Sequence, residues 1–381
     1  MSNSLRWDPY ALIRGNEEVS DFIGNHFENE NRVLYILGKG FDPRMNLGLK
    51  KLLQIRPELN IRCLLIEFDE GKNSYSLNYQ DYVNDNYAEL QKLGKPITEK
   101  NIKLLDGTGN KRRRVGDKGV STLINNYTEI SDYTDIIIDI SSLPRGIFFS
   151  LIGTILAVVQ HAETSLNPVH SQNVFVLTSE NVKLDAEIAE EGIDEELNYP
   201  HGFSGGVELS LQNPKIWFPI LGEGKYTQIQ KAYSKLTPHE ICPLLPFPSR
   251  NPRRSDDLIL EYHRLIFDEL RIERQNIMYA PEQNPFEVYR TLYSAIRNYD
   301  SALSILNGCR AIISTFSSKL LSIGALLAAY QLHNMDDPPL NVGILNVDAQ
   351  GYRIKDEKRF KSLVGETEIF ISWLLGEPYI N

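Results

Sequence analysis

Short apolar runs alternate with longer segments of mixed polarity along most of this chain. Five runs bounded by turn residues lie in the first half, at 33–37, 61–68, 101–105, 136–140 and 174–177. Five more lie in the second half, at 217–221, 241–245, 276–279, 312–315 and 342–345. Such runs, separated by helix-length segments, are typical of parallel strands joined by crossover helices. The pattern predicts an α/β fold made of two tandem Rossmann-like units with parallel sheets.

Similar residues recur at corresponding places in the two halves. YILGKG at 35–40 resembles PILGEGK at 219–225, and CLLIEF at 63–68 resembles CPLLPF at 242–247. IIIDISSLPRG at 136–146 likewise resembles AIISTFSSKLL at 311–321. These pairs predict an internal, pseudo-two-fold duplication. The alternative is that any α/β chain with regular strand spacing resembles a repeat, and superposing 31–180 on 215–350 separates the two.

A chain of 381 residues is long enough for two domains. We expect five segments. They are an N-terminal helical extension at 1–30, a first Rossmann-like unit at 31–180, a connector at 181–214, a second unit at 215–350 and a C-terminal extension at 351–381.

Composition places the chain in the globular class, with 42% hydrophobic and 24% charged residues. The apolar stretch at 146–159 is shorter than a membrane span and predicts a buried helix. The start, MSNSLRWDPY, lacks the basic and apolar regions of a signal peptide, so we expect a cytoplasmic protein with no membrane partner.

Neither metal, disulfide nor broad nucleic-acid binding is indicated. The three cysteines, Cys63, Cys242 and Cys309, are far apart, and we expect buried thiols. The seven histidines form no metal-binding motif, so we expect no metal and no cofactor. A net charge of −10 argues against indiscriminate binding of nucleic acid across a broad face, while a local basic pocket remains compatible with it.

The loops after the first and fourth strands of each unit are the candidate ligand sites, because open parallel sheets bind ligands where the strand order reverses. Glycine turns follow both first strands and lead into helices, where backbone N–H groups and the helix dipole favour an anion. Tight-turn geometry alone is the alternative. The candidates in these turns are Gly38, Lys39, Gly40, Asp42, Arg44, Gly222, Gly224 and Lys225.

Hydroxyls and a cation follow both fourth strands. Ser141, Ser142 and Arg145 lie at this place in the first half, and Ser317, Ser318 and Lys319 in the second. Serines before a helix commonly act as N-caps, which is the alternative to a phosphate cradle.

The run STFSSKLLSIGALLAA at 314–329 resembles the strand-end loop and helix of CARF-type Rossmann domains, and two fused copies resemble the SAVED arrangement. In CARF-type domains a small-residue turn followed by Thr or Ser and Lys opens an apolar helix. The resemblance implies a sensor of cyclic oligonucleotides in prokaryotic antiviral defence. It further implies a ligand lying at the ends of the first and fourth strands, and a protein partner that supplies the output.

Two basic stretches are further candidates. Ser249 and Arg250 belong to a proline-framed loop, PFPSRNPRR at 246–254, whose arginines suit phosphate or pair with Asp256, Asp257 or Glu261. Lys111, Arg112, Arg113 and Arg114 form a basic run that is either solvated or contacts nucleic acid or an acidic partner.

The residues leave three functions open and identify no catalytic group. The leading hypothesis is a binding or sensor protein for a phosphate-rich ligand, a nucleotide or cyclic oligonucleotide. An enzyme acting on a nucleotide at the same crevice, in the manner of a cyclic nucleotide phosphodiesterase, is the second, with cations stabilising developing charge. A scaffold subunit of a multi-protein defence complex is the third.

Overall fold

The chain forms two compact units, and each draws on more than one part of the sequence. The computed structural model describes residues 4–69, 75–106, 113–124, 126–165, 172–194, 197–208 and 212–379. The first unit comprises Pro9–Gly192 and Ala349–Asn381, and the second comprises Met1–Asp8 and Ile193–Asp348. The expected N-terminal extension and connector are therefore each divided between the units, and the expected C-terminal extension belongs to the first.

The first unit is built on a seven-stranded sheet with the order β1-β17-β8-β7-β2-β3-β4. The five neighbouring strands β4, β3, β2, β7 and β8 run parallel to one another, and the sheet is extended by antiparallel pairing of β17 with β8 and of β1 with β17. The strands of this unit, including two short ribbons (β5 with β6, β9 with β16), are β1 (Ala11–Arg14), β2 (Arg32–Gly38), β3 (Asn60–Asp69), β4 (Ile97–Lys103), β5 (Leu105–Asp106), β6 (Arg113–Arg114), β7 (Asp135–Asp139), β8 (Asn173–Glu180), β9 (Ile188–Glu191), β16 (Gly351–Ile354) and β17 (Glu368–Leu375).

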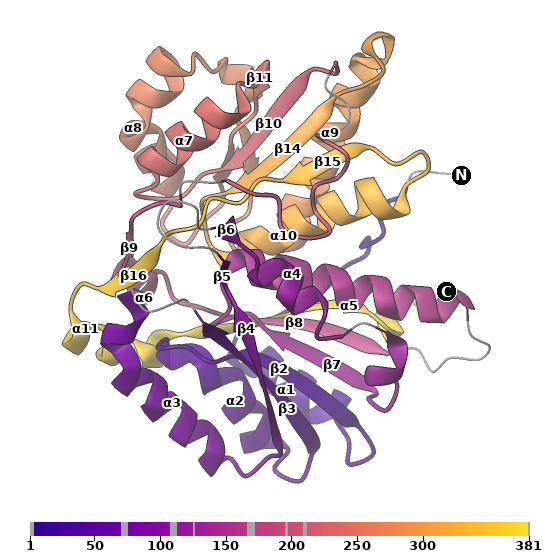
Figure 1. Ribbon diagram of the computed structural model, residues 1–381, viewed down its shortest axis with the longest axis vertical. Coiled ribbons are helices and arrows are strands. Elements are labelled where there is room, and N and C mark those ends of the chain that lie inside the picture. The colour runs from indigo at the N-terminus through magenta and orange to yellow at the C-terminus, as the bar shows by residue number, and fades with distance from the viewer. Residues whose placement is uncertain are drawn as a thin grey trace. The chain divides into compact units, whose positions relative to one another are not determined.

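Helices cover both faces of this sheet (Figure 1), which explains why its central strands are apolar on both sides. Val33, Tyr35 and Leu37 of β2 face one core with α1 and α2, whereas Leu34 and Ile36 are buried on the opposite face. The helices of this unit are α1 (Asn16–His26), α2 (Leu47–Ile55), α3 (Gln80–Lys92), α4 (Gly116–Ser121), α5 (Arg145–Ser165), α6 (Val182–Ala186) and α11 (Glu357–Ser362).

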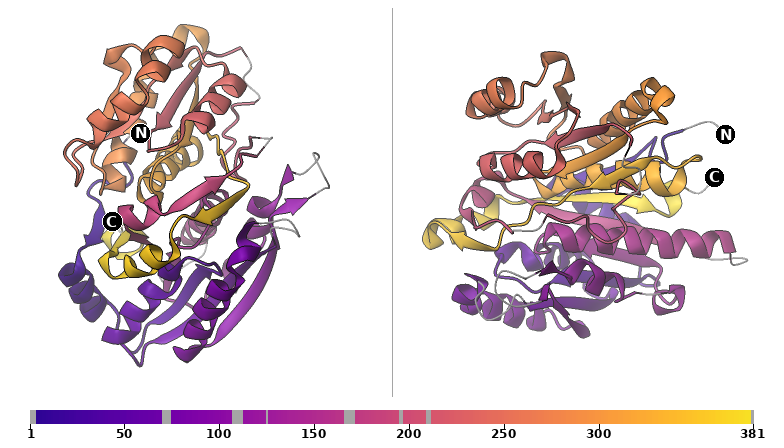
Figure 2. Two further views of the ribbon diagram at one scale, coloured as in Figure 1. Left: turned by 90° about the vertical axis from the view of Figure 1, so that its left-hand side faces the viewer. Right: turned by 45° about the horizontal axis from the view of Figure 1, so that its top comes forward.

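The second unit carries a parallel sheet with the order β13-β12-β10-β14-β15, and β11 also pairs with β10. Figure 2 shows its helices on both sides of the strands. Its strands are β10 (Lys215–Ile220), β11 (Glu240–Ile241), β12 (Leu244–Pro246), β13 (Met278–Ala280), β14 (Arg310–Thr315) and β15 (Asn341–Ile344). Its α-helices are α7 (Tyr226–Leu236), α8 (Arg254–Glu261), α9 (Pro285–Ala302) and α10 (Lys319–Tyr330).

Both units share one strand order. If the five predicted strands of each half are numbered along the chain, each sheet reads 3-2-1-4-5, with the reversal between strands 1 and 4. These strands are β2 and β7 in the first unit, and β10 and β14 in the second. The α/β fold with two Rossmann-like, parallel units is thereby confirmed, and the duplication itself stays a prediction.

The predicted strand at 241–245 is interrupted in the structure. β11 ends at Ile241 and β12 begins at Leu244, so that Cys242 and Pro243 lie between two short strands. Pro243 has no N–H group to donate to a ladder, which accounts for the break.

Helix α5 contains the apolar stretch predicted to be a buried helix. Its segment Arg145–Glu163 is long and apolar enough to cross a membrane, and 56% of that segment is buried within the structure. Ile147, Phe148, Ile152 and Ile155 are among its buried residues. The helix follows β7 and leads to β8 as a crossover of an α/β unit, so the fold accounts for its apolar composition.

Candidate functional site

The loops after strands 1 and 4 pack directly on each other in both units. A Cβ atom at Gly38 would lie 2.7 Å from Leu143 Cδ2, and one at Gly222 would lie 2.4 Å from the Phe316 carbonyl oxygen. Of the four candidate glycines, Gly224 alone has a positive φ, at 70°. Gly38 and Gly222 are thus required by close loop packing rather than by backbone conformation. A Cβ atom at Gly40 would lie 3.6 Å from Ser142 Cβ, which is an ordinary contact.

Lys39 is held by carboxylates of its own unit. Its Nζ donates to Glu67 Oε1 at 2.9 Å, lies 3.6 Å from Glu99 Oε2 and sits 4.6 Å above the ring of Tyr87. Burial by itself lowers the pKa of Lys39, but the two carboxylates outweigh it and raise that pKa. The charge is therefore neutralised within the sheet edge rather than presented to a ligand.

Arg44 is also an internal ion-pair residue. Its guanidinium donates to Asp42 Oδ2 and lies 2.7 Å from Asp185 Oδ1, and it donates to the Ser179 carbonyl at 3.2 Å. Burial lowers the pKa of Arg44, but Asp42 and Asp185 more than compensate and raise it. Asp42 additionally accepts from the Arg44 N–H at 2.9 Å, capping the turn before α2.

The serines after β7 make structural hydrogen bonds. Ser141 Oγ accepts from the Ser179 N–H at 3.0 Å, and Ser142 Oγ donates to the Gly38 carbonyl at 2.7 Å. Arg145 begins α5 at the same edge of the sheet. Ser142 thus fastens the loop after strand 4 to the loop after strand 1.

The glycine turn of the second unit holds a carboxylate on its backbone. Gly224 N–H donates to Glu261 Oε1 at 2.8 Å, and Lys225 N–H donates to the Tyr262 hydroxyl at 2.8 Å. That hydroxyl donates to the Gly222 carbonyl at 2.6 Å. Gly224 and Glu261 are both exposed, whereas Lys225 is half-buried and its N–H group binds the hydroxyl of the buried Tyr262.

A buried arginine lies beside this turn. Arg254 donates to both oxygens of Glu223, from Nε at 2.6 Å and from Nη2 at 2.8 Å, and its Nη1 donates to Glu282 Oε1. Burial raises the pKa of Glu223, but the Arg254 guanidinium outweighs it and holds that pKa below its usual range. Three strand ends, those of β10, β12 and β13, are tied together by these groups.

The proline-framed loop is fixed by internal hydrogen bonds. Ser249 Oγ donates to the Asn251 carbonyl at 2.5 Å, and Arg250 N–H donates to Glu282 Oε2 at 2.9 Å. Arg253 lies 3.7 Å from Asp257, one of the expected acidic partners, whereas Glu261 binds Gly224 instead.

The residues after β14 act partly as helix caps. Ser318 Oγ accepts from the Leu321 N–H at 3.2 Å and caps α10, as the N-cap alternative predicts. Ser317 is buried, and Lys319 is the half-buried first residue of α10.

The basic run is only partly described. Lys111 and Arg112 lie outside the described residues, while Arg113 and Arg114 form β6. Arg114 Nη2 donates to the Ala349 carbonyl at 2.6 Å, so this arginine serves the fold of the first unit.

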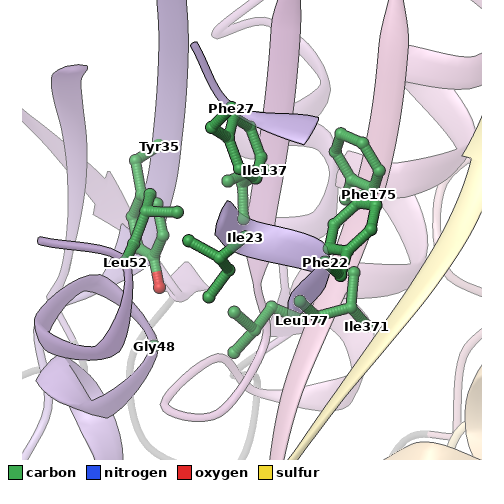
Figure 3. Close-up of a pocket in the computed structure, with 10 residues that line it drawn as sticks. All are labelled: Phe22, Ile23, Phe27, Tyr35, Gly48, Leu52, Ile137, Phe175, Leu177 and Ile371. Atoms are coloured by element: carbon green, nitrogen blue, oxygen red, sulfur yellow. The ribbon is translucent and has the colours of Figure 1, made fainter. Parts of the chain in front are cut away.

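Other potential site chemistry is limited. A small cavity in the first unit (Figure 3) is lined by apolar side chains such as Phe22, Leu52 and Phe175, and by Tyr35, whose hydroxyl donates to Asp139 at 2.7 Å. It offers no cationic group to bind an anion.

Across the described ranges, no group of three histidine, cysteine or acidic residues could hold a metal ion, and all three cysteines are buried thiols.

Several residues that bind the candidate groups in the two units were not identified from the sequence. Glu67, Asp185 and Glu282 were missed as partners of the cations, and Glu261 was named only in the alternative, as a partner for the arginines of the 246–254 loop. All four are distant in sequence from the groups they bind, so only the strand order could have located them.

No protein-family model and no curated protein matches the chain. Among solved structures it is similar to the U34-tRNA thiolase NcsA of Methanococcus maripaludis, at 13% identity and a TM-score of 0.24, over 39% of this chain and 51% of the thiolase. It therefore spans about half of that protein. It is also similar to a putative UDP-N-acetylglucosamine 2-epimerase of Listeria monocytogenes (10%, TM-score 0.23, 78% and 77% covered).

A UDP-GlcNAc 2-epimerase of Methanocaldococcus jannaschii matches at 9% identity and a TM-score of 0.21, over 88% of this chain and 92% of the epimerase. At these identities and TM-scores the similarities carry no conclusion about the function of this chain.

Proposed function

We propose that the protein is a binding protein, or sensor, for a phosphate-rich ligand, a nucleotide or a cyclic oligonucleotide, and that the second unit holds the phosphates at its glycine turn. The observation that carries this proposal is the 2.8 Å hydrogen bond from Gly224 N–H to the exposed Glu261 carboxylate. An anionic oxygen already occupies the place at a helix start where a phosphate oxygen binds.

The electrostatics of the turn support the same ligand class. α7 is 11 residues long, so its dipole presents partial positive charge at Gly224 and Lys225. Cationic side chains of Lys225, Arg250 and Arg254 belong to the turn and to the segment that follows β12, and Arg254 is paired with Glu223 and Glu282.

The proposed biological setting rests on the resemblance of 314–329 to CARF-type domains. In the proposed role, the protein acts in the cytoplasm within a prokaryotic antiviral defence system. Ligand binding would be passed to a partner effector.

The first unit favours a second candidate, a scaffold subunit of a defence complex. Two of its three candidate cations are already paired with carboxylates, Lys39 with Glu67 and Arg44 with Asp42 and Asp185. A strand-end loop whose cations are neutralised in this way stabilises the fold of its unit and is poorly suited to phosphate binding.

A charge reversal at the start of α7 tests the proposed function, and the same change at the end of α7 is its control. We expect Lys225→Glu to weaken binding of ATP and cyclic di-AMP by about ten- to a hundredfold, because one charge-assisted contact is lost and repulsion is added. Isothermal titration calorimetry of the full chain measures this affinity.

Lys235→Glu is the matched control, since Lys235 is exposed in the last turn of the same helix and the net charge changes equally. If both variants bind as the wild type does, or the wild type binds neither nucleotide, the scaffold function takes precedence.

A further inference from the structure

Two large aromatic side chains are exposed next to the proposed phosphate site. Phe247 follows β12 and is 51% exposed, and Tyr279 in β13 is 48% exposed. Their ring centroids are 6.2 Å apart at an interplanar angle of 77°. β13 lies at the edge of its sheet and, among the described strands, pairs with β12 alone.

The strand register places Tyr279 on the same side of the sheet as the helix of the glycine turn. Tyr279 pairs with Leu245 in parallel register, and residues in register project to the same face. Leu245 packs in a core with Ile229 of α7 and Leu258 of α8. Since adjacent strands are about 5 Å apart, β13 is about 10 Å from β10. An extended nucleotide spans that separation.

The loop that carries Phe247 is held in one arrangement by the neighbouring strand ends. Phe247 N–H donates to the Ala280 carbonyl at 2.8 Å, and Glu282 N–H donates to the Pro248 carbonyl at 2.9 Å. Buried Glu282 also accepts from Arg250 N–H and from Arg254. Because the loop is already ordered, little conformational entropy remains to be lost when a ligand binds.

The loop that carries Phe247 also carries positive charge. The Arg253 side chain is 76% exposed, and its ion pair with Asp257 is a solvated contact at 3.7 Å, which contributes little. Arg250 is likewise exposed. An exposed aromatic ring on a loop that also carries exposed arginines matches a ligand that combines a flat heterocycle with phosphate.

We propose that Phe247 and Tyr279 form a stacking subsite for the nucleobase of the ligand, with Arg253 contacting one of its phosphates. This inference rests on the proposed function, which it extends from the phosphates to the base. Stacking recognises the flat face that all nucleobases share, so the subsite selects a nucleotide over a bare polyphosphate.

The test compares ATP with inorganic tripolyphosphate, which has the same phosphate chain and no base. The double variant Phe247→Ala with Tyr279→Ala should weaken ATP binding by about ten- to a hundredfold, because base stacking is lost. Its affinity for tripolyphosphate should remain within about twofold of the wild type. Titration calorimetry of the full chain gives both affinities.

Two controls accompany the double variant. Phe247→Tyr with Tyr279→Phe keeps both rings and should retain ATP binding, and Leu260→Ala removes another side chain, 66% exposed, without touching an aromatic ring. Equal loss for both probes, or unchanged ATP affinity, overturns the stacking subsite while leaving the phosphate site in place. A change in oligomeric state without a change in ATP affinity overturns it in favour of a protein interface. A wild-type protein that binds neither probe overturns the proposed function as well.

Discussion

The buried carboxylate of Asp135 accepts four side-chain hydrogen bonds at the amino end of β7. Its Oδ1 lies 2.9 Å from His26 Nε2 and 3.0 Å from Asn173 Nδ2. Its Oδ2 accepts from Asn31 at 2.7 Å and from Thr134 at 2.6 Å. Burial raises the pKa of Asp135, but the bonds from His26, Thr134 and Asn31 outweigh it and hold that pKa below its ordinary value.

Asp135→Asn should therefore destabilise the first unit, by about 1–3 kcal/mol at pH 7, because buried amide donors would lose an anionic acceptor. A carboxylate with a lowered folded-state pKa stabilises the fold above its unfolded pKa, about 3.9, and that contribution is lost as pH falls through the folded pKa. The difference in the free energy of unfolding between Asp135→Asn and the wild type should accordingly shrink below about pH 4.

Urea unfolding from pH 3 to pH 7 measures this difference, with exposed Asp132→Asn as the control. A loss of stability in Asp135→Asn that is equally large at pH 3 and at pH 7 would contradict the assigned role of the Asp135 carboxylate.

Residue types at the candidate site could be read from the sequence, but their partners could not. Lys39, Arg44 and Lys225 were identified because they adjoin glycine turns. Whether such a cation is available to bind a ligand depends on nearby carboxylates. The strand order brings Glu67 close to Lys39 and Asp185 close to Arg44. Glycine illustrates the same limit, because Gly38 and Gly222 look like flexible turn residues and are in fact required by loop packing.

At the scale of elements, the predicted strands were largely correct because each is a short apolar run between turn signals. The break between β11 and β12 and the shift of β4 toward Ile97 were not anticipated. β4 is a mostly exposed strand, so its apolar signal is weak, and pairing with β3 decides its bounds.

The close packing of α10 on α9 depends on a glycine. A Cβ atom at Gly324 would lie 2.4 Å from the Pro285 carbonyl oxygen and 2.6 Å from Val288 Cβ. Gly324→Ala should therefore destabilise the second unit by about 1–3 kcal/mol. This would occur although alanine is the better helix former by about 1 kcal/mol.

Thermal unfolding measures the effect, and Gly365→Ala serves as the control because a Cβ atom there would meet no neighbour within 4 Å. A Gly324→Ala variant at least as stable as the wild type would show that α9 and α10 pack less closely than the structure has them.

At the scale of the whole molecule, the two sheets share one strand order, but the chain does not divide as the apolar runs predict. β17 pairs with β8, and β1 pairs with β17, so both ends of the chain extend the first sheet. Residues before β1 belong to the second unit, where Trp7 packs edge-on against Tyr289 with centroids 5.3 Å apart. Antiparallel additions of this kind leave no periodic signal that assigns them to one sheet.

In the proposed function, the glycine turn of the second unit binds phosphate in competition with its own Glu261 carboxylate. Titration of inorganic tripolyphosphate into the full chain, both wild type and Glu261→Gln, tests this competition. We predict that Glu261→Gln binds about tenfold more tightly, because the neutral amide no longer competes as an anion for Gly224 N–H. Equal or weaker binding by Glu261→Gln, or no binding by either protein, would contradict the claim.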